Sequence, residues 1–407
     1  MLYDIAVVGG GAAGLFAAIT AKKLNNKLNI AVFEALDRVG KKLITTGNGQ
    51  CNITNRYAEP RFYHSETPEL LRYPLEAFTV NDTVKAFREI GVEIVFEADG
   101  RAYPASYQAG AVVDALRFTC EELGVEVICN AKVSSFSKKE YFSLKTEQGD
   151  FSAKKVILAC GLLSGGAKLG SFGDTLRLLK ESGYKAAKTT PAIVQLKTDT
   201  AVTRSLKGIK FSGEATLLEN GKKVSKSSGE ILFTDYGLSG PAILAVSHEA
   251  ARRSGKIEVA LDILPDFEEE ELSELLYSRR ENLSARCSEN FLTGLINKRL
   301  GQALLKGVGI PLNIAVSDIT DKQLSDLCRL IKGFTFAVTG NTGFNNSQVT
   351  AGGISLREID IKTFEAGRQS GLYIIGELLD ADGDCGGFNL QWAWSSAALA
   401  ARSAVRL

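Results

Sequence analysis

The sequence predicts an α/β protein built around a nucleotide-binding sheet, and three observations carry that prediction. A short apolar run, Tyr3–Val8, ends in glycines and is followed by an alanine-rich stretch with helical character. Buried runs that end in glycine recur at residues 154–161 and 371–376. Between these two runs, residues 190–262 carry short β-branched segments, and residues 263–330 are rich in leucine, glutamate and arginine. The pattern indicates a nucleotide-binding sheet together with a β-rich region and a helical region.

Length and composition place the chain among ordinary globular proteins. Its 407 residues exceed what one core usually organises, so we expect two or three domains. Apolar residues make up 45% and charged residues 23%, and 48 Lys and Arg nearly balance 47 Asp and Glu. The global charge therefore predicts neither a nucleic-acid nor a membrane partner.

Cysteine and histidine usage argues against a metal site. The seven cysteines are scattered with no CxxC spacing, and His64 and His248 are the two histidines. Reduced thiols and no bound metal are expected. The N-terminus opens into a patterned strand that contains Asp4, unlike a signal peptide, and no apolar run approaches the roughly 20 residues of a membrane span. We therefore expect a cytoplasmic protein.

The first glycine turn has the composition of a dinucleotide-binding fingerprint. Gly9 permits a tight turn, Gly11 lets the backbone approach a pyrophosphate, and Gly14 allows close packing of helix on strand. The next strand ends at Glu34, whose carboxylate is placed to bind ribose hydroxyls. The phosphates of a dinucleotide are thus expected over the N-terminus of the first helix, although this motif alone does not separate FAD from NAD.

Two late motifs favour FAD. A buried strand near the C-terminus is followed by Gly376 and Glu377, which suit contact with a ribityl chain or pyrophosphate. A helix then begins around Gly387 and Asn389, and its free N–H groups could stabilise negative charge at the flavin N1 and O2 edge. A nicotinamide enzyme has no need of such a late element.

Two further segments complete the expected cofactor site. The strand at residues 154–161 ends in Gly161, another position where backbone and cofactor could approach closely. A strand at residues 130–136 places the backbone of Val133 where it could hydrogen-bond an adenine edge. Both segments are expected to lie in the same domain as the first fingerprint.

Longer motifs resemble those of a known bacterial family. The runs Gly40–Asn55, Gly229–Leu244, Val349–Asp360 and Gly386–Trp394 are similar to those of BaiN/RdsA-type NAD(P)/FAD-dependent oxidoreductases, which are also labelled aminoacetone-oxidase-like flavoproteins. That resemblance implies a discontinuous, glutathione-reductase-like Rossmann FAD domain with an inserted β-barrel-like domain and a small, mostly helical domain. The expected boundaries are 1–189 and 348–407 for the FAD domain, 190–262 and 331–347 for the barrel, and 263–330 for the helices.

The resemblance also implies particular cofactor contacts. Carried over position by position, it places these residues near FAD: Ala13, Glu34, Lys41, Lys42, Val133, Glu377, Asp384, Asn389 and Leu390. Gly49 is a further expected cofactor-binding residue. This chain departs from the family at Gln50, where arginine is usual, and at Asp235, where histidine is common. Both departures make the expected site less positive and weaken any transfer of substrate identity from the family.

The catalytic candidates are few. A flavin reductase often needs an acid to protonate its product, and Cys51, Tyr103 and Tyr236 are candidates, with Arg101 as an anchor for an anion or carbonyl. Cys51 and Cys385 could form a redox pair, but two free thiols are favoured because no CxxC geometry supports the pair. Because a single fingerprint is present, NADH or NADPH should visit the FAD cleft transiently, which predicts ping-pong kinetics.

These features lead to one preferred function and two alternatives. The preferred function is NAD(P)H-driven reduction of a polarised C=C bond, in an enone or in a uracil-type substrate such as a uridine in ribosomal RNA. The alternatives are a flavin amine oxidase acting on an aminoacetone-like substrate and a non-catalytic flavin-bearing interaction protein. An RNA-facing patch would have to come from the basic residues of the inserts, although a solvated surface is favoured: Lys207, Lys210, Lys222, Lys223, Lys226, Arg252, Arg253, Arg279, Arg280, Lys298 and Arg299.

Overall fold

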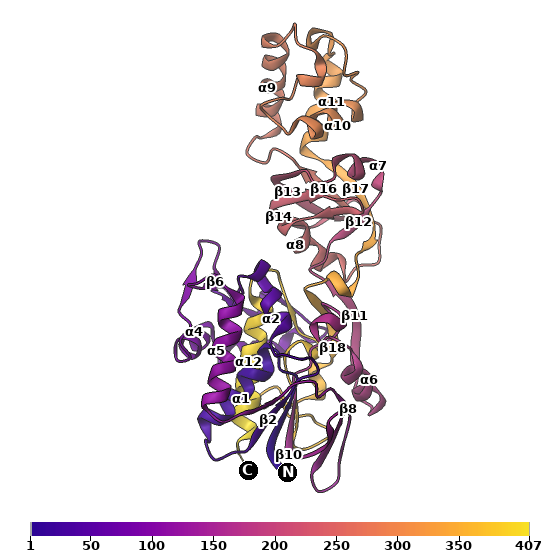
Figure 1. The fold of residues 1–407 in the computed structure, drawn as a ribbon. Helices are drawn as coiled ribbons and strands as arrows, with labels where there is room; N and C mark the ends of the chain where they lie inside the picture. The colour runs from indigo at the N-terminus through magenta and orange to yellow at the C-terminus, as the bar shows by residue number, and fades with distance from the viewer. Residues whose placement is uncertain (1, 407) are drawn as a thin grey trace. The chain divides into compact units, whose positions relative to one another are not determined.

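The computed structural model describes residues 2–406 and divides them between two compact units (Figure 1). The sheet unit combines Met1–Pro191 with Phe344–Leu407, and the insert unit is Ala192–Gly343. The polypeptide thus leaves the first unit once and returns to it near residue 344. Each unit has its own buried apolar cluster.

A mixed sheet forms the centre of the first unit. Its parallel part contains β1 (Leu2–Val8), β2 (Ile30–Phe33), β7 (Glu126–Ile128), β10 (Gly149–Leu158) and β19 (Leu372–Ile374), with β1 between β2 and β10. The antiparallel strands β8 (Val133–Lys138) and β9 (Phe142–Thr146) extend it beyond β10. The central strands are buried and rich in β-branched residues, as expected for a sheet covered on both faces.

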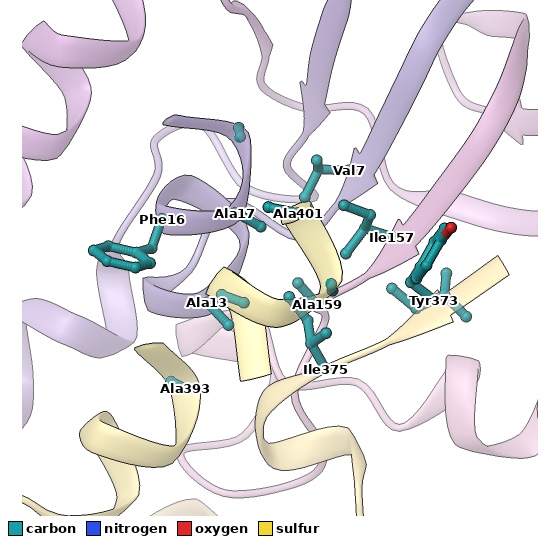
Figure 2. Packing of buried hydrophobic residues seen from close by; sticks show 14 of the residues in the cluster. Val7, Ala13, Phe16, Ala17, Ile157, Ala159, Tyr373, Ile375, Ala393 and Ala401 are labelled. Carbon is teal, nitrogen blue, oxygen red and sulfur yellow. The ribbon is translucent and has the colours of Figure 1, made fainter. Parts of the chain in front are cut away.

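Two helices from opposite ends of the chain pack together on this sheet. They are α1 (Ala12–Leu24) and α12 (Phe388–Ala404). In Figure 2, Ala13 and Ala17 of α1 lie close to Ala401 of α12 above the ends of the central strands. The small side chains permit a close approach of the two helices. Since α12 is buried around most of its circumference, it behaves as a core helix.

Smaller elements surround this core. In chain order the remaining helices and strands of the sheet unit are α2 (Lys41–Thr45), β3 (Thr54–Asn55), β4 (Tyr63–His64), α3 (Arg72–Ala77), α4 (Val80–Arg88), β5 (Ile94–Phe96), β6 (Arg101–Pro104), α5 (Ala109–Glu122), α6 (Asp174–Glu181), β11 (Ala186–Ala192), β18 (Val349–Ile354) and β20 (Asp382–Gly383). Strands β3, β6 and β5 form a small antiparallel sheet, and β20 pairs with β4.

The insert unit contains a closed six-stranded barrel and a group of helices. The barrel order is β12 (Leu196–Thr198), β15 (Gly237–Ser239), β14 (Lys222–Phe233), β13 (Lys210–Glu219), β16 (Ile257–Asp262) and β17 (Phe334–Asn341). The helices are α7 (Thr200–Thr203), α8 (Pro241–Ala250), α9 (Glu269–Asn282), α10 (Lys298–Gly307) and α11 (Asp321–Lys332). The predicted α/β class, parallel sheet, barrel insert and helical insert are therefore confirmed.

Several element boundaries differ from the sequence predictions for local reasons. The first helix begins at Ala12 and not at Leu15, where the sequence pattern predicts a helix over Leu15–Leu24, because Gly11 serves as its N-cap. Strand β8 begins only at Val133, since Asn130 adopts a left-handed conformation with φ of 54°. Strand β17 begins at Phe334, because α11 continues to Lys332. Among the described residues, the helices include none with both the length and the apolar character needed to cross a bilayer.

We expect that Trp394→Ala destabilises the sheet unit by about 3–5 kcal/mol. Trp394 is fully buried, its indole N–H donates to the Ile53 carbonyl at 2.8 Å, and its ring contacts Phe16 at 5.3 Å between centroids. Urea unfolding of flavin-free protein measures the effect. Phe118→Ala, at a position 47% exposed, is the control and should change the unfolding free energy little. Equal effects of the two substitutions would contradict the anchoring role of Trp394.

Candidate functional site

The N-terminus of α1 is built by close backbone packing. Gly9 has φ of 108°, and a Cβ there would lie 2.6 Å from the Ala159 carbonyl oxygen. A Cβ on Gly14 would lie 1.9 Å from the Gly9 carbonyl oxygen. Neither position can hold a side chain without moving the backbone. A Cβ on Gly11, by contrast, would meet no heavy atom within 4 Å, so open space lies beside the start of the helix.

Glu34 is a buried carboxylate beside this helix start. Its side chain is 8% exposed, and its two oxygens accept hydrogen bonds from the Gly10 N–H at 2.8 Å and the Leu36 N–H at 2.9 Å. Burial raises the pKa of Glu34, while these N–H groups oppose the shift by favouring the charged form. The carboxylate is therefore oriented by the fingerprint loop itself, at the edge where a ribose would lie.

Three further segments of the chain approach the carboxylate of Glu377. Lys42 of α2 forms an ion pair with Glu377 Oε2, and the Thr350 N–H donates to Glu377 Oε1 at 2.8 Å. A Cβ on Gly161 would lie 3.5 Å from Glu377 Oε2, so the end of the β10 segment approaches the same carboxylate. The neighbouring Lys41 pairs instead with Asp37. Of the two predicted lysines, Lys42 is thus the one tied to the C-terminal motif.

Gly376 brings the two ends of the chain into contact. Its φ is 65°, and a Cβ built on it would lie 3.2 Å from the Ala13 Cβ of α1. Its N–H donates to Ser396 Oγ at 3.0 Å, and its carbonyl accepts from the Trp392 indole at 3.1 Å. Segments from both ends of the chain therefore meet at this glycine, α1 near the N-terminus and α12 near the C-terminus.

The start of α12 is a second uncapped helix N-terminus. Gly387 is its N-cap, with φ of 99° and no side-chain cap, and a Cβ there would lie 2.3 Å from the Thr54 carbonyl oxygen. The Asn389 amide exchanges hydrogen bonds with the Gly383 backbone at 2.8 and 2.7 Å, which fixes the preceding loop. Asp384 in that loop lies 2.8 Å from the His64 imidazole. Leu390 is partly buried against the core of the sheet unit.

The predicted adenine-side residue lies at a strand irregularity. Val133 is the first residue of β8 and pairs with Thr146, and the register shifts between Val133 and Ser135. Two residues earlier, the Ala131 N–H donates to the Glu34 carbonyl at 2.8 Å. The backbone near Val133 is thereby held next to the strand that ends in Glu34.

The loop after α2 is conformationally strained. Gly47, Asn48, Gly49 and Cys51 have φ of 57°, 55°, 85° and 61°. Two non-glycine residues in the left-handed region within four positions mark a loop whose shape is imposed by its surroundings. A Cβ on Gly49 would meet no heavy atom within 4 Å, so the loop leaves space on that side.

The cysteine candidates lack thiolate character. Cys51 is fully buried, and burial raises the pKa of its thiol to about 12. Burial also raises the pKa of Cys385, partly offset by the nearby Arg101. Both are free thiols in the structure. The geometry gives no support to a reactive Cys51.

Arg101 and Tyr103 face the same side of β6. Tyr103 is 6% exposed, burial raises the pKa of its hydroxyl, and its side chain interacts with the Arg101 guanidinium. Arg101 also pairs with Asp99 at 3.2 Å. The remaining acid candidate, Tyr236, belongs to the insert unit, where its carbonyl accepts from the Thr198 N–H at 3.1 Å.

Five of the eleven basic residues considered for an RNA-facing patch form ion pairs with acids. Ion pairs join Lys207 to Asp235, Lys210 to Glu230, Lys226 to Glu214, Arg253 to Glu219 and Arg280 to Asp321. Such exposed pairs contribute little stability but reduce the local positive potential. The arrangement favours a solvated surface over a strong anion-binding face.

The sequence interpretation missed several residues that shape the site. Gly10 supplies the N–H that orients Glu34, and Ser396 and Trp392 bind the two backbone groups of Gly376. Gly10 could have been found, since it lies within the run of three glycines. Ser396 and Trp392 carry no local signal, because their contacts with Gly376 form only when α12 packs beside it.

The residues present fit a bound dinucleotide. One unit holds two uncapped helix N-termini, a buried and oriented carboxylate, and open space beside Gly11 and Gly49. Helix N-termini favour phosphate or other negative charge, and the carboxylate suits ribose hydroxyls. The predicted cofactor residues therefore gather in the sheet unit, from both of its chain segments.

Comparison with known proteins gives full-length matches. The sequence matches the family described as HI0933-like protein Rossmann domain over residues 3–403. A 3-dehydro-bile acid delta(4,6)-reductase from Clostridium scindens is 32% identical over 98% of each chain. A ribosomal RNA dihydrouridine synthase from Haemophilus influenzae is 30% identical, again over 98% of each chain. The solved structure of a 3-ketosteroid delta1-dehydrogenase from Sterolibacterium denitrificans has a TM-score of 0.51 at 13% identity, covering 99% of both chains, and shares the fold.

We expect that Glu34→Gln weakens FAD binding about tenfold or more, since a hydrogen bond to a charged group contributes about 1.5–3 kcal/mol. The amide can accept from only one of the two N–H groups that Glu34 now binds, and it loses the charge that favours ribose hydroxyls. Titration of flavin-free protein with FAD, followed by flavin fluorescence, measures the affinity. Glu69→Gln, at an exposed position paired with Arg357, is the control. Unchanged affinity in Glu34→Gln would remove this residue from the site.

We expect iodoacetamide to spare Cys51 in the native protein at pH 8, because the thiolate is the reacting species and burial holds the Cys51 pKa near 12. The exposed Cys287 should react first. Mass spectrometry of proteolytic fragments identifies the labelled residue. Rapid labelling of Cys51 with loss of activity would restore it as a catalytic candidate.

Proposed function

The chain belongs to the HI0933-like protein Rossmann domain family, and on that premise we propose that it uses NADH or NADPH to reduce a polarised C=C bond. The protein is an FAD-dependent oxidoreductase. The proposal concerns the finer reaction: which bond is reduced, which nicotinamide is used, and which residues act.

The observation that carries the proposal is the pair of full-length relatives. One is named for the reduction of delta(4,6) bonds in a 3-dehydro-bile acid, and the other for the synthesis of dihydrouridine. Dihydrouridine is uridine with its ring C=C bond reduced, so both names describe reduction of a ring C=C bond conjugated to a carbonyl. The shared chemistry supports a substrate of that class, either a free small molecule or a base in ribosomal RNA.

The sheet unit offers residues to hold FAD. We assign the pyrophosphate to the start of α1, at Gly9, Gly11, Ala13 and Gly14, and the ribose hydroxyls to Glu34. When bound, FAD supplies hydride transfer from a nicotinamide to an acceptor. The other predicted contacts come from the surrounding loops and strands: Lys41, Lys42, Gly49, Val133, Gly161, Gly376, Glu377, Asp384, Gly387, Asn389 and Leu390.

The start of α12 would favour negative charge in its vicinity. Its first N–H groups have no acceptor within the helix, and Gly387 provides no side-chain cap. Asn389 holds the loop before the helix, so those N–H groups are fixed in direction before any ligand arrives. A preorganised positive end of this kind stabilises charge at low reorganisation cost.

Tyr103 and Arg101 are the proposed proton donor and carbonyl anchor. Burial raises the pKa of the Tyr103 hydroxyl, so its Oη holds its proton at neutral pH. The Arg101 guanidinium lies on the same face of β6, where it could bind the carbonyl oxygen conjugated to the reduced bond. Cys51 and Tyr236 are the weaker candidates for the acid. Cys51 is fully buried, and Tyr236 belongs to the insert unit.

We expect that NADH or NADPH bleaches the oxidised flavin under anaerobic conditions and that aminoacetone does not. A C=C acceptor should then restore the flavin absorbance: a 3-keto-4-ene steroid, uridine or a ribosomal RNA fragment. Because FAD occupies the one nucleotide fingerprint, NAD(P)H and the acceptor should use the same cleft in turn, and initial-rate plots at several NAD(P)H concentrations should be parallel, as in ping-pong kinetics.

Three results would contradict this proposal. Intersecting rate lines would indicate a ternary complex. Bleaching by aminoacetone with peroxide release on aeration would indicate an amine oxidase. A bound flavin that no donor reduces would indicate an interaction protein. If RNA is the acceptor, its binding should weaken steeply with salt.

A further inference from the structure

We propose that Tyr107 is the outer ring of an aromatic platform that stacks on a flat conjugated ring of a reactant. The inference deepens the proposed function and rests on it, because the reactants there are flat rings: a nicotinamide donor and an acceptor with a conjugated C=C bond. Tyr107 was not among the site residues expected from the sequence.

The platform consists of two stacked tyrosines. The Tyr103 and Tyr107 rings lie 5.5 Å apart between centroids, with an interplanar angle of 29°. Tyr103 is the inner ring, at 6% exposure, and Tyr107 is the outer ring, at 40% exposure. The buried ring packs against the outer one and limits its orientation, while Tyr107 keeps 40% of its surface exposed. A preorganised aromatic face of this kind suits stacking with a planar ligand.

The backbone at Tyr107 is strained. Its φ is 52°, in the left-handed region that a bulky side chain rarely adopts, and its N–H donates to the Pro104 carbonyl at 2.8 Å. Glycine would fit this turn with less strain. A tyrosine kept in such a conformation, with much of its ring in solvent, contributes little to the core. Strain of this kind concentrates at functional sites.

The platform borders two loops of the candidate site. A Cβ on Gly47 would lie 3.5 Å from Tyr103 Cε1, which places the strained loop after α2 beside the inner ring. A Cβ on Gly386 would lie 3.8 Å from Arg101 Nε, which places the loop before α12 beside the guanidinium. Arg101 and Tyr103 share one face of β6, because side chains alternate along a strand and Ala102 between them is fully buried.

The chemistry of the aromatic platform indicates which class of ligand it would bind. Uracil, a conjugated enone ring and nicotinamide are all flat π systems that carry a carbonyl group, so each could stack on the exposed part of Tyr107. A saturated, puckered ring would lose the stacking contact. The platform should therefore distinguish a flat ring from its reduced form, which would favour release of a reduced product.

The test uses FAD-loaded protein and measures binding at equilibrium by flavin difference absorbance. The probes are NADP⁺, uridine 5′-monophosphate, 4-androstene-3,17-dione and, as a puckered control, dihydrouridine 5′-monophosphate. The variants are Tyr107→Gly and Tyr107→Phe. Tyr141→Gly is the matched control, because Tyr141 is also 40% exposed but lies in the connection between β8 and β9.

We expect Tyr107→Gly to raise the apparent Kd of at least one flat probe about tenfold, since stacking on an aromatic side chain has effects of this size. Tyr107→Phe and Tyr141→Gly should bind that probe like the parent, and the dihydrouridine control should be insensitive to all three changes. The responding probe identifies the ring: NADP⁺ indicates the donor, and the other two indicate the acceptor. The Tm of Tyr107→Gly should stay close to the parent value, since glycine relieves the strain.

Several outcomes would overturn the platform. One is that Tyr107→Gly binds every probe as tightly as the parent, and another is that Tyr107→Gly and Tyr141→Gly lose equal affinity. A large fall in the Tm of Tyr107→Gly would assign the ring a structural role. Failure of the parent protein to bind any flat probe would also reject the platform.

These results are separable from failure of the proposed function. If NAD(P)H reduces the flavin and a C=C acceptor reoxidises it while Tyr107→Gly binds normally, only the platform is rejected. Probe binding that depends on Tyr107, without flavin reduction, rejects only the proposed reaction.

Discussion

The packing of α1 against α12 is the contact on which the rest of the sheet unit depends. The two helices come from opposite ends of the chain, and small residues such as Ala13, Ala17 and Ala401 let them approach closely (Figure 2). Gly376 fits against Ala13 at this junction and is held by Ser396 and Trp392 of α12. Because both helix starts belong to one packed core, the two positive ends that would face the cofactor are positioned before it binds.

The carboxylates of Glu34 and Glu377 in the sheet unit accept hydrogen bonds from backbone N–H groups. Glu34 accepts from two N–H groups of the fingerprint region, and Glu377 accepts from the Thr350 N–H while paired with Lys42. A buried carboxylate without such partners would be costly. The same bonds that stabilise these groups also fix the direction of their side chains. The strained loop at Gly47–Cys51 and the strained Tyr107 lie next to this ordered framework, which can support them.

The insert unit is organised by its own contacts. Lys332, the last residue of α11, pairs with Asp262 at 2.6 Å and donates to the carbonyls of Leu264 and Phe267. Asp262 ends β16 of the barrel, so this one ammonium group links the helices to the barrel.

The sequence by itself determined the α/β class, the β-rich and helical regions and the glycine fingerprint, because strand–turn–helix patterns and glycine requirements are local properties of the chain. Gly9, Gly14 and Glu34 could be identified from spacing alone. Only the tertiary structure decided the partners of Gly376, the burial of Cys51, and the stacking of Tyr107 on Tyr103, since each depends on segments that meet only after folding. A tyrosine in a left-handed turn has no signature in sequence, because its strain is imposed by the surrounding fold.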